Sequence, residues 1–183
     1  MALLTLVTEP DPRYSQISDR LRQRCAPITA FDDALLDLER DLYETLDAEH
    51  GVGLAAPQVG ILQQICVIRV PEGYEYEDSP ETRLTLINPE VMRAGGQEVD
   101  VEGCLSFPEL IGDVPRYTSI TVRSHTTEGK LVKIKAHDYL ARVMQHEIDH
   151  LNGILFFDRM VDWSTLRYPA PASDGATASP LAE

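Results

Sequence analysis

Residues 145–150 read Gln-His-Glu-Ile-Asp-His, and the rest of the chain is best interpreted outward from this stretch. His146 and His150 are four positions apart, so in a helix both imidazoles project from one face and can bind the same metal ion. Glu147 lies about 100° further round the helix and can reach a water molecule beside that ion. The alternative is a pair of solvent-facing histidines on a charged helix. The hexapeptide predicts a metal-dependent hydrolase.

The flanking residues predict a helix over 138–152, with Asp138 as its N-cap and Asn152-Gly153 as a left-handed C-terminal cap. Other segments carry the patterns of both helices and strands. The expected elements are a helix over 29–49 capped by Asp32 or Asp33 and ending at residues 51–53, strands over 65–70 and 84–87, the second ending at Asn88-Pro89, a solvated acidic loop over 72–81, and an antiparallel hairpin of 118–123 and 131–136 around Glu128-Gly129.

Composition narrows the function classes. The chain has 183 residues, of which 43% are hydrophobic, so it is long and apolar enough for one domain with a real core. Its 16 Lys and Arg against 30 Asp and Glu give a net charge of −14, which argues against a nucleic-acid site and against an anionic membrane surface. We expect a catalytic domain over residues 1–168 and a flexible Ala/Pro-rich tail over 169–183.

The cysteines and the apolar runs indicate a compartment. Cys25, Cys66 and Cys104 are odd in number and widely spaced, which is not a disulfide framework and fits a reducing environment. No apolar run approaches the roughly 18 residues that span a bilayer, and the N-terminus lacks the basic flank of a signal peptide. The sequence therefore predicts a cytoplasmic protein.

A catalytic metal usually takes three protein ligands, and the downstream sequence offers no good third one. In the pattern HExxHxxGxxH the third histidine would fall at Phe156, which cannot bind a metal. Cys104, in Glu102-Gly103-Cys104-Leu105-Ser106, is the preferred upstream candidate because glycine permits close approach and a thiolate is a soft donor. Cys25 and Cys66 compete by residue type alone, and the remaining histidines fit surface or loop positions: His50, His125 and His137.

A third segment, Gly51-Val52-Gly53-Leu54-Ala55-Ala56-Pro57-Gln58, is dense in small residues and ends in an amide that can donate a hydrogen bond. It has neither the Lys of a phosphate loop nor the third Gly of the dinucleotide fingerprint. The alternative is a tightly packed turn between a helix and a strand.

Together these three segments resemble the signature motifs of the peptide deformylases, in the same order and at sensible separation. The resemblance runs from about Asp32 to Met160 and includes Val114-Pro115-Arg116. It implies an α+β fold with twisted, mostly antiparallel sheets packed around a central helix carrying HExxH. It also implies removal of the formyl group from N-formylmethionyl nascent polypeptides, with release of formate.

The resemblance further implies one divalent metal ion, commonly Fe²⁺ and often exchanged for Zn²⁺, Ni²⁺ or Co²⁺. The residue roles that it implies are metal ligation by Cys104, His146 and His150, proton transfer by Glu147, oxyanion stabilisation by the Gln58 side chain and the Leu105 backbone N–H, and pairing with the substrate backbone by Val52, Gly53 and Gly103. A transient ribosome contact is a further expectation. Two alternatives stay open, namely a zinc peptidase built on the same helix and a catalytically silent, deformylase-like binding protein.

Overall fold

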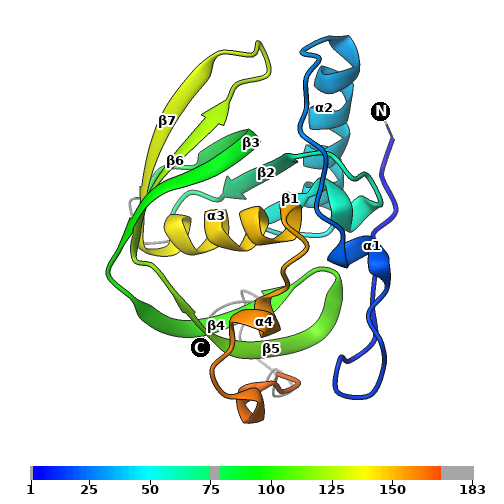
Figure 1. The fold of residues 1–183 in the computed structure, drawn as a ribbon, viewed down its shortest axis with the longest axis vertical. Coiled ribbons are helices and arrows are strands. Elements are labelled where there is room, and N and C mark those ends of the chain that lie inside the picture. The colour runs from blue at the N-terminus through cyan, green and yellow to red at the C-terminus, as the bar shows by residue number, and fades with distance from the viewer. Residues whose placement is uncertain (1, 75–78, 170–183) are drawn as a thin grey trace.

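The computed structural model describes residues 2–74 and 79–169 (Figure 1). Its centre is a helix, α3 (Asp138–Leu151), which lies between a large sheet and a small one (Figure 1). The large sheet is antiparallel throughout and has the order β1-β2-β3-β6-β7. Its strands are β1 (Gly53–Ala55), β2 (Ile65–Val70), β3 (Thr82–Gly95), β6 (Ser119–His125) and β7 (Leu131–His137). The small sheet pairs β4 (Glu98–Cys104) with β5 (Phe107–Arg116). The expected α+β architecture is confirmed.

Strand β2 joins two hydrophobic clusters because its side chains alternate between the two faces of the sheet. Ile65 and Val67 pack with the helix α2 (Asp33–Ala48) on one face. Cys66 and Ile68 pack with α3 on the other. An uninterrupted apolar run is therefore required here, and the strand predicted over 65–70 is found at those residues. The short elements are α1 (Asp19–Arg22), η1 (Ala56–Val59), α4 (Phe156–Arg159) and η2 (Trp163–Thr165).

The strand predicted over 84–87 does not end at Asn88-Pro89 as expected, since the observed strand β3 continues to Gly95. Asn88 adopts a left-handed backbone with φ 50°, and the register with β6 shifts between Ile87 and Glu90. This irregularity absorbs the proline, and the strand resumes beyond it. The Asn88 side chain in turn accepts from Ile28 N at 2.8 Å and donates to Ile28 O at 2.8 Å.

The predicted helix caps are partly confirmed. Asp32 caps α2, accepting a hydrogen bond from Leu35 N at 3.3 Å, and Gly153 has the left-handed φ of 73° expected after α3. The N-cap of α3 is His137 and not Asp138, which is the first helical residue and itself has φ 47°. The reason is that β7 runs directly into the helix, without the extended residue at 138 that an Asp cap requires.

The β6–β7 hairpin is confirmed, with Gly129 at φ 78° in its turn. The β4–β5 hairpin was not predicted, because Pro108, Gly112 and Pro115 lower the strand propensity of β5. Of the acidic loop over 72–81, residues 75–78 lie outside the described residues. Nearly all of the predicted tail over 169–183 also lies outside them, from residue 170 onward.

Candidate metal centre and active site

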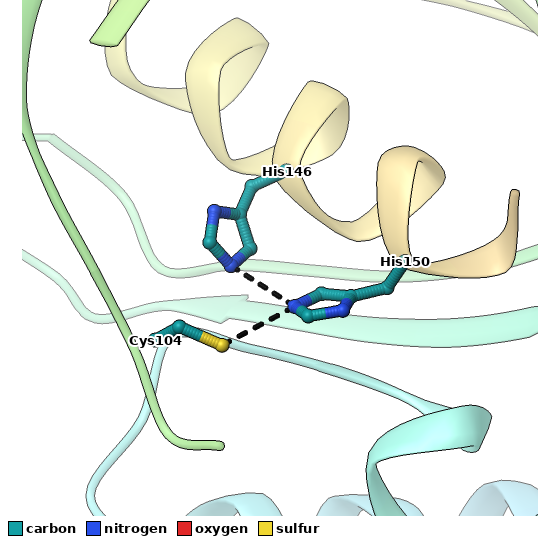
Figure 2. A group of neighbouring side chains, drawn as sticks. All are labelled: Cys104, His146 and His150. Carbon is teal, nitrogen blue, oxygen red and sulfur yellow. Dashed lines mark hydrogen bonds between the residues drawn. The ribbon is translucent and has the colours of Figure 1, made fainter. Parts of the chain in front are cut away.

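Three possible metal ligands converge from α3 and the end of β4. His150 Nε2 lies 3.2 Å from His146 Nε2 and 3.3 Å from Cys104 Sγ (Figure 2). Among the described residues this is the group of three or more potential ligands that could hold a metal ion, with all ligand atoms within 4.8 Å of one another. Ligand atoms placed tetrahedrally at about 2.0 to 2.3 Å from one ion lie ~3.3 to 3.6 Å apart. The triplet therefore fits a single divalent ion.

Helix α3 is buried on nearly every side, including the side that bears its polar residues. Ten of its 14 residues are buried, among them Glu147, Asp149 and His150. A helix with one apolar stripe would leave such side chains in water. Their burial is explained by the small sheet, which covers the polar side of the helix and brings Cys104 to the histidines.

Glu102 orients the first histidine. Its Oε2 accepts a hydrogen bond from His146 Nδ1 at 3.0 Å, which directs Nε2 of that ring toward Cys104 and His150. Burial by itself raises the pKa of Glu102, but the hydrogen bonds from His146 and Arg116 outweigh it and hold this pKa well below its usual value. Glu102 is therefore a buried anion.

Two arginines neutralise that anion. Arg116 binds it through two parallel hydrogen bonds of 2.8 and 2.9 Å, and Arg142 donates to it at 2.8 Å. Arg116 also donates to Asp149 at 2.5 Å, and Asp149 receives Arg159 at 2.6 and 2.9 Å. Through these ion pairs the central helix α3 is connected to β4 and β5 of the small sheet and to α4. None of these charged residues has a role predicted from the sequence, although Glu102 lies within the segment 102–106 and Asp149 within the segment 145–150.

The Gln58 amide is held in one orientation. Ala55 N donates to its Oε1 at 2.8 Å, so Nε2 turns toward Cys104 Sγ at 3.5 Å and Ser106 Oγ at 3.4 Å. Gln58 is buried in η1, directly after β1. Its NH2 group is therefore aimed at the metal-ligand cluster, and the structure brings the segment 51–58 together with the segment 102–106.

Glu147 lies against the backbone of Gly53, within the segment 51–58. A Cβ added to Gly53 would be only 2.3 Å from Glu147 Oε1, so this contact requires glycine. Glu147 Oε2 is buried and has no hydrogen-bond partner among the described residues. Burial raises the pKa of Glu147 to about 7. Such a carboxyl can both accept and donate a proton near neutral pH.

Two strand edges flank the cluster. In the described chain β1 and β4 each have one unpaired edge, and Gly53 and Gly103 lie on them. A Cβ on Gly51 would lie 2.8 Å from Leu105 Cδ1, so the segments that carry these edges are close together. The segment before α1 joins them through backbone hydrogen bonds that the motifs did not predict: Val7 N to Gln58 O at 2.7 Å and Glu9 N to Ser106 O at 2.8 Å.

The competing ligands lie elsewhere. Cys25 and Cys66 are buried in the hydrophobic cluster between the large sheet and α3, and burial raises the pKa of both thiols, that of Cys25 to about 11. His50 and His137 are exposed, and His125 is half-buried against Phe31 with ring centroids 5.6 Å apart. None of these five belongs to the ligand triplet.

An α+β fold with an HExxH helix, a convergent cysteine and a buried glutamate defines the class of metal-dependent amide hydrolases. Comparison with known proteins makes the assignment specific. The model of the polypeptide deformylase family matches residues 4–165, a longer stretch than the resemblance over 32–160. The peptide deformylase of Thermomicrobium roseum is 49% identical over 168 residues, covering 92% of each chain, and that of Roseiflexus castenholzii is 44% identical, covering 85% of this chain and 91% of the relative.

Solved structures of peptide deformylases are similar to this chain in fold and in sequence. A peptide deformylase from Thermotoga maritima has 36% identity and a TM-score of 0.76, covering 88% of this chain and 100% of its own. A class I type b enzyme from Acinetobacter baumannii, bound to Met-Ala-Ser, has 32% identity and a TM-score of 0.77, covering 87% and 99%.

The chain belongs to the polypeptide deformylase family. It is a hydrolase that depends on a single divalent metal ion and removes the formyl group from the N-terminus of N-formylmethionyl peptides. None of the helices within residues 2–74 and 79–169 combines the length and the apolar character of a membrane span.

Proposed function

We propose that Cys104, His146 and His150 hold the metal ion, and that Glu147 transfers the protons of deformylation. The Gln58 side chain and the Leu105 backbone N–H stabilise the oxyanion. The observation that carries these assignments is the fixed Gln58 amide, 3.5 Å from Cys104 Sγ, opposite a buried glutamate on the ligand helix. A donor and a base thus flank one ligand triplet.

When bound, the divalent ion supplies Lewis-acid activation of water and of the formyl oxygen. Glu147 accepts a proton from the attacking water as the water oxygen bonds to the formyl carbon. Gln58 Nε2 and Leu105 N–H donate hydrogen bonds to the developing oxyanion, each worth about 2.7 to 4 kcal/mol of barrier in comparable enzymes. Glu147 then delivers the proton to the amine as the carbon–nitrogen bond breaks. The products are formate and a free N-terminal methionine.

The substrate backbone lies as an added strand between the two open edges of β1 and β4. Val52 and Gly53 pair with it on one side and Gly103 on the other, since both edges present free backbone groups next to the ligand triplet. The Acinetobacter baumannii relative, bound to Met-Ala-Ser, holds the peptide that deformylation of formyl-Met-Ala-Ser would produce. The same peptide is the appropriate substrate for this chain.

Release of formate from formyl-Met-Ala-Ser tests the assignment, with the peptide products identified by mass spectrometry. We expect one formate for each Met-Ala-Ser and no cleavage between amino acids. Cleavage of internal bonds would favour the zinc peptidase. A metal-loaded protein that binds the peptide and releases nothing would favour the silent binding protein. The position of Phe156, where a third histidine would be needed, argues against the first of these, and the buried Glu147 argues against the second.

We assign Fe²⁺ as the native ion, because one thiolate and two imidazoles suit it as well as Zn²⁺, Ni²⁺ or Co²⁺ and the family resemblance favours iron. Protein purified without oxygen should contain iron, lose activity in air and keep it after replacement by nickel. Full and air-stable activity with zinc alone would contradict the assignment.

The cellular setting follows from the substrate. Nascent formylated chains and three unpaired cysteines suit the cytoplasm, with a transient ribosome contact during synthesis. Residues 1–168 form the catalytic domain in this proposal, and residues 169–183 contribute nothing to catalysis. A shortened chain ending at 168 tests that division directly.

A further inference from the structure

One face of the large sheet is basic although the chain is strongly acidic. All three lysines of the sequence, Lys130, Lys133 and Lys135, occur within six residues at the β6–β7 turn and on β7. Pairing across the strands places further cations beside them. We call Arg93, Arg123, Lys133, Lys135 and His137 the basic face.

Strand register shows why these side chains share a face. Directly paired residues on antiparallel strands point to the same side of a sheet. Lys135 pairs with Thr121, and Thr121 pairs with Arg93, so the three form one row across β7, β6 and β3. Lys133 pairs with Arg123 in the next row. The intervening residues of β6 and β7, such as Val122 and Ala136, point inward to the hydrophobic cluster under α3.

A hollow of about 210 Å³ lies on the basic face. Gly95 leaves room at one side of it, and Arg93, Lys135 and His137 surround it together with the hydroxyls of Ser119 and Thr121. Cations around an open hollow are the groups that bind a phosphate, and the Ser119 hydroxyl there donates to Gly95 O at 3.4 Å. The two rows of Lys133 and Lys135 contain no large apolar side chain, and the next row on this face of β7 carries the exposed Leu131.

The charges of the basic face are available to a partner. Arg93, Lys133 and Lys135 are exposed and make no ion pair within the described residues. Arg123 forms an ion pair with Glu90, its partner on β3. Within the described residues of these two rows, Glu90 is the one acidic side chain. The net charge of −14 is therefore distributed unevenly over the surface. The molecule as a whole repels a polyanion, but the basic face attracts one.

The basic face and the ligand triplet lie on opposite sides of the large sheet. The inward residues of β6 and β7 belong to one hydrophobic cluster with α3, which lies between the two sheets (Figure 1). His146 and His150 of α3 converge with Cys104, at the end of strand β4 of the small sheet. A partner on the basic face would leave the strand edges of β1 and β4 open to the substrate.

We infer that the basic face docks the phosphate backbone of RNA. This rests on the proposed function, because a nascent chain is attached to an RNA-rich particle and a deformylase meets both at once. Lys133 and Lys135, two residues apart on one strand, are separated by about 6.6 Å, which suits neighbouring phosphates of one strand. Three free cations predict weak, sequence-independent and transient binding, with a slope of log affinity against log salt of about −2 to −3.

The test is fluorescence anisotropy of a fluorescein-labelled 20-base-pair RNA duplex of mixed sequence, titrated with the full-length metal-loaded protein at 50, 100 and 200 mM KCl. We expect binding to weaken about 16- to 64-fold across this range. The double variant Lys133→Gln/Lys135→Gln should lower the slope by about 1.8 and weaken binding at 50 mM by at least about fivefold. The matched control Arg20→Gln/Arg24→Gln removes two exposed charges near α1 and should bind as the parent does.

Three outcomes would overturn the inference: no saturable binding at 50 mM KCl, equal weakening by the two double variants, or tighter lysine-dependent binding to phosphatidylglycerol vesicles than to RNA. Formate release from formyl-Met-Ala-Ser, measured on the same preparations, should be unchanged by Lys133→Gln/Lys135→Gln. If the parent releases no formate, the proposed function fails, and the RNA titration still decides whether the basic face binds a polyanion.

Discussion

Glu102→Gln is the substitution that most sharply tests how the metal centre is held. The carboxylate accepts four hydrogen bonds: two from Arg116, one from Arg142 and one from His146. Glutamine keeps one oxygen, which can retain two of them, and turns an NH2 group toward the remaining donors. Losing two charged hydrogen bonds at about 1.5 to 3 kcal/mol each predicts a loss of ~3 to 6 kcal/mol. Breaking one partner of a buried ion pair gives a similar figure, about 3 to 5 kcal/mol.

Two measurements separate the effects of this change. Urea unfolding in the presence of a chelator reports the free energy of unfolding without metal, and it should fall by the amount above. Competition with a chromophoric chelator reports Zn²⁺ affinity, which should fall about 10- to 100-fold because His146 loses the acceptor that orients it.

The control is Glu98→Gln, the same chemical change two pleats away on β4, where the side chain is exposed. It should alter the free energy of unfolding by no more than about 0.5 kcal/mol. If Glu102→Gln is as mild as this control in both measurements, the buried charge network does not hold the metal centre and the reasoning is refuted.

Three further predictions follow from individual contacts. Gly53→Ala should lower kcat about 100-fold with the metal content unchanged, since the new methyl group displaces the Glu147 carboxylate; unaltered steady-state kinetics would contradict this. Removing the metal with a chelator should lower Tm by roughly 8 to 16 °C in thermal unfolding at metal concentrations near 1,000 times Kd, and an unchanged Tm would exclude a metal that stabilises the fold. Deleting residues 169–183 should leave Tm and formate release as they are, and a loss of either would give this segment a role.

Local patterns were sufficient for much of the fold. The β2 strand could be predicted because it is buried on both faces and hence apolar without interruption, and the β6–β7 hairpin because its polarity alternates around Gly129. The extension of β3 past Pro89 could not, because it depends on a left-handed Asn88 that bonds Ile28, 60 residues away.

The candidate site also contains residues that the sequence could predict and residues that it could not. Two histidines at helical spacing predict their own proximity, and elimination of downstream ligands favoured Cys104, which the structure places 3.3 Å from His150. The supporting charges were not predictable, since Arg116 reaches both Glu102 and Asp149 only after the small sheet folds over α3. Such long-range ion pairs leave no periodic signal in a sequence. The resemblance to deformylases did what spacing alone could not, by giving Gln58 and Leu105 their expected roles.

The central claim is that metal binding and proton transfer belong to different residues of one centre. Its most direct test is the metal content of Glu147→Gln and Cys104→Ser, determined beside formate release from formyl-Met-Ala-Ser. The account predicts one metal ion per chain and no turnover for Glu147→Gln, and loss of the metal on dialysis for Cys104→Ser. Equal metal loss in the two variants, or turnover in Glu147→Gln near that of the parent, would contradict it.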